Sequence, residues 1–408
     1  MRRKKKLAGL MGVFFLFLAL AAMPAPAGAE KSATWLSIGP LTGPGAGAVL
    51  PMTLGNADYV KEINARGGVD GVKINFVPVD SRYDVARGIS IYQRYRKTPR
   101  MLVVYTAKTG LAKALGPLIN RDRHINFISG AGFAQAKIGR AFLMLGVYQD
   151  IFGAALDWMV EDWNKKGKPG KPTVGYLSWE GAYGKQALNG GTQYAEKLGV
   201  KLLPPEFYPT GSLKHDTWLN RLAKEGANYI YIGGVDPSQT NVIRDAHALG
   251  LTEKIQMVSA EWGLMSTVGV SKYPRELEGS VVVTPQLRGV ERLKHPMAKL
   301  WTKYRKKPLE DMNPFYLGGI ATGMVVEEGL KIALKQVGYK KIGGDAMLKA
   351  FEQLKGRDVG QGITGICDYS PTSRLGTKQV RVYRVKGGTV VPITDWIMAP
   401  DCVKLGKF

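Results

Sequence analysis

Residues able to do acid–base, nucleophilic or metal chemistry are few in this sequence and widely separated. The four histidines show no paired spacing of the kind that holds a metal ion; they are His124, His215, His247 and His295. The chain also lacks the G-x-S-x-G, H-E-x-x-H and P-loop patterns. No residue is nominated as a nucleophile together with its base, so we expect a protein that is not an enzyme and needs no metal or cofactor.

A glycine-rich loop at residues 39–48 follows an apolar run and loosely satisfies the dinucleotide-binding pattern through Gly43, Gly45 and Ala48. Two features disfavour a nucleotide. Pro44 removes one of the N–H groups that would contact a pyrophosphate. Asp80, which ends the next apolar run, lies about 37 residues beyond Gly43, whereas the acidic residue that contacts the ribose lies about 20 residues away.

The two cysteines, Cys367 and Cys402, both lie near the C-terminus. In an oxidising compartment an even number of cysteines favours a disulfide, and we predict one here. Closing this loop of about 35 residues would stabilise the fold by about 3–4 kcal/mol. The alternative is a pair of buried thiols.

Short apolar strands alternate with amphipathic helices, and the pattern occurs twice. We predict strands at 35–39, 74–79, 101–105 and 125–129, then at 173–178, 229–233, 255–258 and 280–284, with a last one at 379–385. Predicted helices include 184–198, 213–225, 237–249, 296–304, 315–337 and 345–354. This alternation predicts two similar lobes, each with a helix-covered parallel sheet. Ligands bind beyond the carboxyl ends of such strands, so the strand-end loops should carry the site.

Two segments resemble the start of the leucine/isoleucine/valine-binding family, the periplasmic solute receptors of ABC importers. They are LSIGPLTG at 36–43 and KEINARGGVDGVKI at 61–74, followed by Asp80. The resemblance continues through Tyr183-Gly184, YIGG at 231–234 and Ala260-Glu261, and so extends over nearly all of the chain after residue 29.

The resemblance implies an α/β fold of two Rossmann-like lobes with parallel sheets, joined by three crossing strands. This is the Venus-flytrap arrangement of type I periplasmic binding proteins. The crossings would fall near 147–150, 284–288 and 373–378. The implied domains are a signal peptide (1–29), an N-terminal lobe (30–150 plus 286–374) and a C-terminal lobe (151–285 plus 375–408).

In that family the first lobe holds a ligand carboxylate with hydroxyls and backbone N–H groups. Thr109 matches such a hydroxyl position at the start of a helix, and the neighbouring Lys108 is either solvated or paired with the carboxylate. The loop Ser129-Gly130-Ala131-Gly132 matches a second group of contacts, from which we select Ser129, Ala131 and Gly132. Tyr105 replaces a family glycine, and its ring would fill space that the family leaves open.

The second lobe of the family contacts the ligand's ammonium group with a carboxylate. Glu261 matches that glutamate, and Tyr183 matches a family tyrosine. Less specific interpretations stay open for each residue. Glu261 would otherwise be an exposed loop carboxylate, Tyr183 a core residue, and Thr109 a helix cap. Trp262 belongs either to the core or to the cleft wall.

The N-terminus has the features of a cleaved secretory signal: a cationic start at residues 2–6, an apolar run at 7–22 and small residues at 27–29. No cysteine lies near the cut, so we expect a periplasmic protein without a lipid anchor. The net charge of +24 falls to +19 once the five signal cations are removed. Because the cations are spread along the chain and export removes nucleic acid as a partner, we interpret them as a solvated basic surface, with an acidic docking partner as the alternative.

The sequence therefore predicts a receptor that delivers a branched-chain or similar amino acid to the membrane permease of an ABC importer, and we expect a monomer. Two alternatives remain open. The same fold would suit an aromatic carboxylate, a short amide or another small polar solute, or the protein would report its ligand to a membrane signalling protein.

Overall fold

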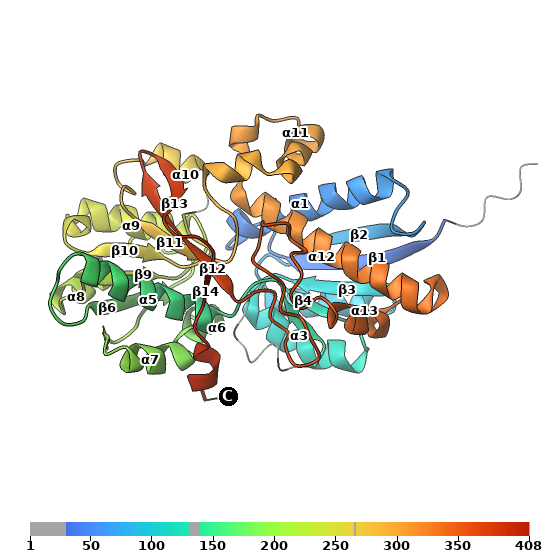
Figure 1. The fold of residues 1–408 in the computed structure, drawn as a ribbon, viewed down its shortest axis with the longest axis horizontal. Helices are drawn as coiled ribbons and strands as arrows, with labels where there is room; N and C mark the ends of the chain where they lie inside the picture. The colour runs from blue at the N-terminus through green and yellow to red at the C-terminus, as the bar shows by residue number, and fades with distance from the viewer. Residues whose placement is uncertain (1–29, 131, 133–136, 138, 265–266, 408) are drawn as a thin grey trace, which may run out of the picture.

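The computed structural model describes residues 30–407, apart from 131, 133–136, 138 and 265–266. It has two lobes side by side, each built around one sheet with helices on both faces (Figure 1). The predicted two-lobed α/β fold is confirmed. The predicted signal peptide lies outside the described residues.

The first lobe contains a five-stranded sheet in the order β2-β1-β3-β4-β5, and every pairing is parallel. Its strands are β1 (Ser32–Gly39), β2 (Lys73–Asp80), β3 (Met101–Thr106), β4 (Asn126–Ile128) and β5 (Ala141–Leu143). Its helices are α1 (Ala46–Ala65), α2 (Val85–Tyr95), α3 (Thr109–Arg121), α11 (Lys299–Arg305), α12 (Pro314–Val337) and α13 (Gly344–Phe351). β1 and β2 pair until Gly39 lies opposite Asp80, so the loops after both strands emerge at the same edge of the sheet.

The second lobe contains a mixed nine-stranded sheet. Its strands are β6 (Thr173–Trp179), β7 (Lys201–Leu202), β8 (Glu206–Tyr208), β9 (Tyr229–Ile232), β10 (Gln256–Ser259), β11 (Val281–Thr284), β12 (Gln379–Lys386), β13 (Thr389–Pro392) and β14 (Ile397–Met398). Its helices are α5 (Tyr148–Lys165), α6 (Ala182–Gln186), α7 (Leu188–Lys197), α8 (Asp216–Lys224), α9 (Ser238–Ala248) and α10 (Thr267–Lys272). Strands β6, β9, β10 and β11 are parallel, whereas β12 to β14 add antiparallel pairs at one edge.

Short 3-10 helices occupy several connections: η1 (Leu251–Glu253), η2 (Val290–Lys294), η3 (Pro296–Ala298), η4 (Leu309–Asp311), η5 (Tyr339–Lys341) and η6 (Cys402–Leu405). The helix predicted at 184–198 is divided into α6 and α7, and the backbone leaves the helical region at Asn189 and Gly190. Gly190 has a positive φ and its Cα faces the backbone carbonyl of Cys402, so a side chain there would collide with the C-terminal segment.

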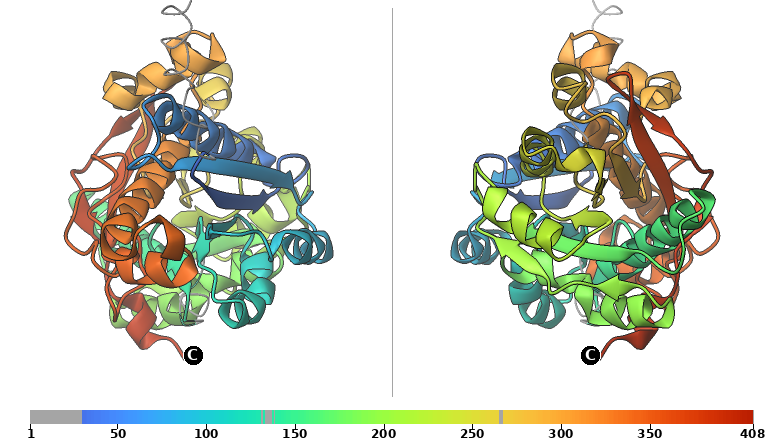
Figure 2. Two further views of the ribbon diagram at one scale, coloured as in Figure 1. Left: turned by 90° about the vertical axis from the view of Figure 1, so that its right-hand side faces the viewer. Right: turned by 90° about the vertical axis from the view of Figure 1, so that its left-hand side faces the viewer.

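The chain passes between the two sheets three times, after β5, after β11 and before β12. The colours of Figures 1 and 2 show the result, because the orange α12 and α13 join the blue lobe and the red β12 joins the green and yellow lobe. The domain boundaries predicted from the family remain predictions at the level of single residues.

The two lobes are closed on each other. Gly47, at the start of α1, faces the backbone carbonyl of Asp236 so closely that a Cβ atom would collide with it. The ring of Tyr83 meets that of Trp179 edge-on at 6.1 Å between centroids. Trp262 stacks on Phe315 at 5.6 Å. Side chains of both lobes therefore line whatever space remains between them.

The predicted disulfide is wrong, because both cysteines are free and buried. Cys367 lies in a loop after α13, where its backbone forms an isolated antiparallel β-bridge with Thr377, and its side chain belongs to the main core. Cys402 begins η6, and its sulfur packs against Gly153 of α5 in the second lobe. The third passage between the lobes lies between the two residues, so closeness in sequence does not bring them together.

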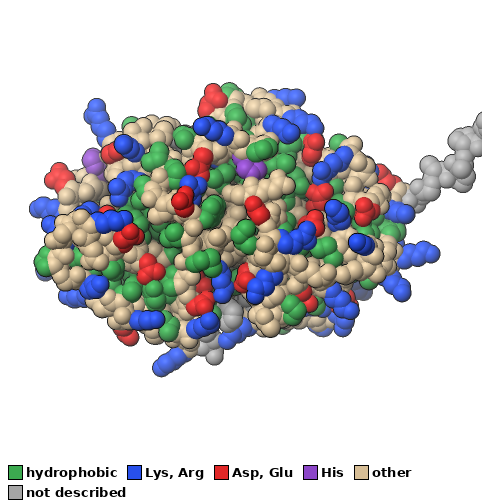
Figure 3. Space-filling model, viewed as in Figure 1, with side chains coloured by type: hydrophobic (Ala, Val, Ile, Leu, Met, Phe, Trp, Pro, Cys, Tyr) green, Lys and Arg blue, Asp and Glu red, His purple; other side chains and the backbone are tan. Residues whose placement is uncertain are grey.

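Charged side chains are scattered over the surface. On the face drawn in Figure 3, Lys and Arg lie on both lobes with Asp and Glu among them. This distribution agrees with a solvated basic surface. None of the helices that the structure describes has both the length and the apolar character needed to cross a membrane.

Candidate functional site

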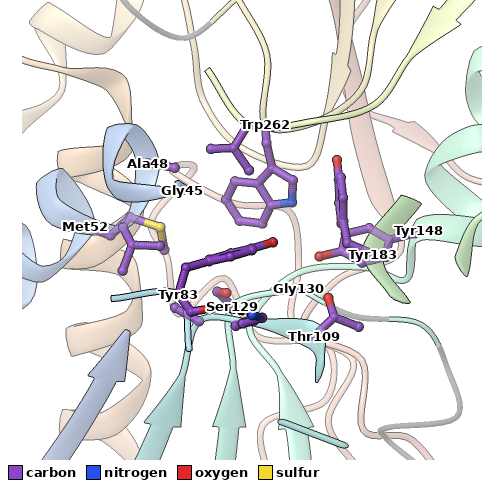
Figure 4. Close-up of a pocket in the computed structure, with 14 residues that line it drawn as sticks. Gly45, Ala48, Met52, Tyr83, Thr109, Ser129, Gly130, Tyr148, Tyr183 and Trp262 are labelled. Carbon is purple, nitrogen blue, oxygen red and sulfur yellow. Dashed lines mark hydrogen bonds between the residues drawn. The ribbon is translucent and has the colours of Figure 1, made fainter. Parts of the chain in front are cut away.

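A pocket of about 430 Å³, partly open to solvent, lies between the lobes at the carboxyl ends of strands from both sheets (Figure 4). The first lobe contributes the loops after β1, β2, β3 and β4, and the second lobe contributes those after β6, β9 and β10. The lining residues are Gly45, Ala48, Val49, Met52, Tyr83, Ala107, Lys108, Thr109, Ser129, Gly130, Tyr148, Tyr183, Val235 and Trp262. The expectation that strand-end loops form the pocket is met.

Thr109 and Lys108 lie where β3 passes into α3. Thr109 is the first residue of α3 and is buried, and its side chain interacts with the hydroxyl of Tyr148. No side chain in the described part of the protein caps this helix, so its first N–H groups are available to an anion in the pocket. Lys108 is half-buried, and its ammonium donates to the backbone carbonyl of Tyr83 and lies 4.0 Å from that ring's centroid. Burial lowers the pKa of Lys108, which Asp84 partly counters.

The loop after β4 contributes Ser129 and Gly130 to the pocket. Ser129 is buried, and its backbone N–H donates to the carbonyl of Thr106 at 3.2 Å, which fixes the loop beside β3. A Cβ atom on Gly130 would lie 2.9 Å from Cζ2 of Trp262 in the opposite lobe. Gly132 is buried but does not line the pocket, and Ala131 lies outside the described residues.

Tyr105 lies in the core of the first lobe and not in the pocket. Its side chain is fully buried, and burial raises the pKa of its hydroxyl. The expected intrusion of this ring into ligand space is therefore absent. β3 is buried on both faces, so its sequence does not alternate between apolar and polar residues. The sequence therefore gives no indication of the face on which the Tyr105 ring lies.

Four aromatic side chains line the pocket. Figure 4 shows the rings of Tyr83 and Trp262 on opposite sides of the space, with Tyr148 and Tyr183 beside them. Trp262 lines the pocket and also belongs to the buried core cluster, so both interpretations apply to it. Tyr83 and Tyr148 were not among the pocket residues predicted from the sequence. Tyr83 follows β2, so the strand-end rule was a signal that could have found it, whereas Tyr148 lay in the predicted crossing at 147–150.

Glu261 occupies a smaller compartment of about 200 Å³ next to the pocket, and the two spaces share Tyr148 and Tyr183. The compartment is also lined by Tyr176, Ser178, Ala187, Tyr231, Gly233 and Ala260. Tyr183 stands between Glu261 and the pocket, with its hydroxyl 3.4 Å from Oε1 of Glu261. That hydroxyl also donates to the carbonyl of Gly234 at 3.1 Å.

Glu261 is a buried carboxylate without a cation. Only 2% of the residue is exposed, and no Lys, Arg or His of the described residues lies within ion-pair distance. Burial raises the pKa of Glu261 to about 7, and its negative charge in turn helps to raise the pKa of the surrounding tyrosines. A buried charge is costly unless it is paired, so this compartment favours a cationic group or a proton.

The pocket therefore combines hydroxyls and free helix N–H groups on one side, aromatic walls, and a carboxylate behind Tyr183. Such a set recognises polar ends of a small molecule and encloses its apolar part. Across the described part of the chain, no cluster of three or more His, Cys, Asp or Glu side chains could hold a metal ion.

Comparison with known proteins agrees with this architecture. The model of the family described as "Periplasmic binding protein" matches residues 37–389. A Leu/Ile/Val-binding protein homolog 1 from Brucella suis is 24% identical over 271 residues, which cover 65% of this chain and 71% of the relative. The Leu/Ile/Val-binding protein of Escherichia coli is 24% identical over 259 residues, covering 61% and 66%.

Solved structures share the fold over nearly the whole chain. A branched-chain amino acid ABC transporter protein from Thermus thermophilus with bound valine superposes with a TM-score of 0.82 at 21% identity, covering 92% of this chain and 99% of that one. A solute-binding protein from Rhodopseudomonas palustris in complex with p-hydroxybenzoic acid gives 0.75 at 15% identity, covering 92% and 99%. The family model covers most of the sequence, and the chain belongs to the periplasmic binding protein family.

Proposed function

We propose that this protein is the solute receptor of an ABC importer and that it closes on an α-amino acid with an apolar side chain. The observation that carries the proposal is Glu261, a carboxylate buried beside the interlobe pocket with no cation from the described residues near it. An ammonium group on the ligand would supply the missing positive charge.

In the proposed complex the ligand carboxylate contacts the start of α3 and the hydroxyls of Thr109 and Ser129. These groups line one side of the pocket, and helix N–H groups favour an anion. The ammonium points past Tyr183 toward Glu261. The ligand's side chain packs among Tyr83, Trp262 and the other apolar groups of the pocket.

The names of the relatives support this class of ligand, since several are Leu/Ile/Val-binding proteins and one solved neighbour contains valine. Under the same proposal the chain is exported by a cleaved signal peptide, works in the periplasm as a monomer and binds the membrane permease. It recognises its solute without reacting with it.

A thermal-shift screen of the protein from residue 30 tests the proposal. Leucine, isoleucine and valine are compared with their deaminated acids and with benzoate and p-hydroxybenzoate. A ligand at 100 times its Kd adds about 2.7 kcal/mol to stability, which is easily measured as a rise in Tm. Stabilisation by the amino acids alone is the expected result. Stabilisation by none of the compounds that carry an amine would contradict the proposal.

One observation favours an aromatic carboxylate as the second candidate ligand. Burial places the pKa of Glu261 near 7, so the carboxyl group can be protonated and donate a hydrogen bond to a neutral or anionic ligand. The aromatic walls suit a planar ring. Stabilisation by p-hydroxybenzoate with none by leucine would favour this candidate over the amino acid.

A further inference from the structure

A second cavity, of about 900 Å³ and also open to solvent, lies between the lobes on the far side of the Trp262–Phe315 stack. The second lobe contributes α10 and the turn between β12 and β13, and the first contributes the segment before α12. Residues 288–293, which follow the second passage between the lobes, complete the wall. In Figure 1 the enclosing elements α10 and β13 lie at the upper edge of the molecule, near α11. The cavity shares no lining residue with the proposed solute pocket.

Two buried arginines line this cavity. Arg288 is 1% exposed and Arg292 is 3% exposed. The guanidinium of Arg288 donates to Oε1 of Gln286 at 2.5 Å and to the carbonyl of Leu287 at 3.3 Å, while its Nε has no partner among the residues that the structure describes. Arg292 donates to the carbonyl of Gly289 at 2.5 Å and to that of Met312 at 3.3 Å. Each guanidinium has five N–H donors, so among the described residues most of these donors have no acceptor.

Neither arginine forms an ion pair within the described part of the chain. The positive charge of Arg292 repels that of Arg288. Burial lowers the pKa of Arg288 to about 9 and that of Arg292 to about 10, so both remain charged at neutral pH. Asp236 acts on Arg288 only at longer range, and Glu310 and Asp311 are exposed at the rim of the cavity. Arg288 also packs 4.8 Å from the centroid of Phe315, which fixes its plane.

The rest of the wall is mainly apolar, with Leu264, Val270, Leu293, Pro314 and Val390. A guanidinium fork matches the geometry of a carboxylate, and a buried cation without a counter-ion is costly. We propose that this cavity is a second binding site, which takes an organic acid by holding its carboxylate at Arg288 and Arg292 and its apolar body against these walls. Because both lobes enclose the cavity, an occupant stabilises the closed arrangement.

Titration calorimetry with octanoate tests the proposal, and 1-octanol is the matched probe without a charge. Octanoate should bind to the wild type and octanol should not. Arg288→Met keeps an unbranched apolar side chain but removes the charge, and it should weaken octanoate binding roughly thirty-fold or more. Leucine binding, measured on the same variant, should change by less than about three-fold because Arg288 does not line the solute pocket.

A second variant covers the case in which Arg288→Met does not fold. Val290 lines the cavity and is 46% exposed, so Val290→Glu places a negative charge at the rim with little effect on the core. It should weaken octanoate binding about three- to ten-fold at low salt and less at high salt, with Val290→Gln as the control. The proposal is overturned if octanoate fails to bind, if it binds all variants as it binds the wild type, or if leucine displaces it competitively.

Discussion

Glu261→Gln should remove much of the affinity for an α-amino acid while leaving the fold intact. The substitution keeps the shape of the side chain and deletes its charge. Burial moves the pKa of Glu261 from 4.5 to about 7 in the closed arrangement, so enclosing the carboxylate without a cation costs about 3 kcal/mol. The ligand's ammonium offsets this cost and its own desolvation. With glutamine the ammonium would be enclosed beside a neutral amide, and losing one side of such a pair typically costs about 2–5 kcal/mol, or about thirty-fold or more in Kd.

The assay is titration calorimetry of two ligands on two proteins. Leucine carries the ammonium group, and 4-methylpentanoate is the same molecule without it. The four Kd values form a cycle that isolates the interaction between Glu261 and the ammonium from other effects of the substitution. The variant should bind leucine more weakly and 4-methylpentanoate at least as tightly as the wild type does. Glu253→Gln is the matched control, since Glu253 is exposed on η1 in the same lobe.

A coupling energy near zero would mean that Glu261 does not interact with the ligand's ammonium group. In that outcome leucine and 4-methylpentanoate would lose affinity equally, and Glu261 would act by shaping the compartment. Equal Tm values for the unliganded wild type and variant at pH 5, where the carboxyl group is largely protonated in the closed form, would show that the fold itself is preserved.

Three further predictions follow from the closed arrangement and the buried groups. Gly130→Val should weaken ligand binding by about 1–3 kcal/mol with little change in Tm, because the new side chain meets Trp262 only when the lobes close; unchanged affinity in calorimetry would contradict this contact. The unliganded protein should be more compact at pH 5 than at pH 8. The pKa of Glu261 is higher in the closed form than in the open form, so protonation of this carboxyl group stabilises the closed form fully below about pH 4.5, and the stabilisation is lost as the pH rises through about 7. X-ray scattering checks this prediction, and Glu261→Gln should abolish the difference. Thiol titration should find no reactive thiol in the native protein and two reactive thiols after unfolding without reductant, since Cys367 and Cys402 are free and buried. If no thiol reacts after unfolding, the two cysteines form a disulfide.

The strands that the sequence predicts well are those with long apolar runs. The predictions at 101–105 and 229–233 differ by one residue at one end from β3 and β9. The strands that were missed are short: β5, β7, β8 and β14 have two or three residues each, and β13 has four. Their pairing depends on neighbours far along the chain, and so few residues carry no periodic signal.

Residues of the candidate site could be predicted where they follow the end of a strand. They could not be predicted where a side chain within a strand can lie on either face of the sheet. Thr109, Ser129 and Tyr183 line the pocket because they follow β3, β4 and β6. Tyr105 precedes one of these loops by only a few residues, yet it belongs to a strand buried on both faces and points into the core.

Pairings between distant residues were the least accessible from the sequence. Cys367 and Cys402 are near in the chain, but the chain passes from one lobe to the other between them. A disulfide between them could be excluded only once this passage was known. The positions of Arg288 and Arg292 are a similar case. Nothing in their local sequence indicates burial, which results from the packing of both lobes around them.

X-ray scattering of the protein from residue 30, with and without the solute found by the thermal-shift screen, tests whether the two lobes open in the absence of solute and close on it. At saturating ligand the radius of gyration should fall, since bringing the lobes together shortens the molecule. A scattering profile that does not change at saturation would contradict the account of a receptor that closes on its ligand.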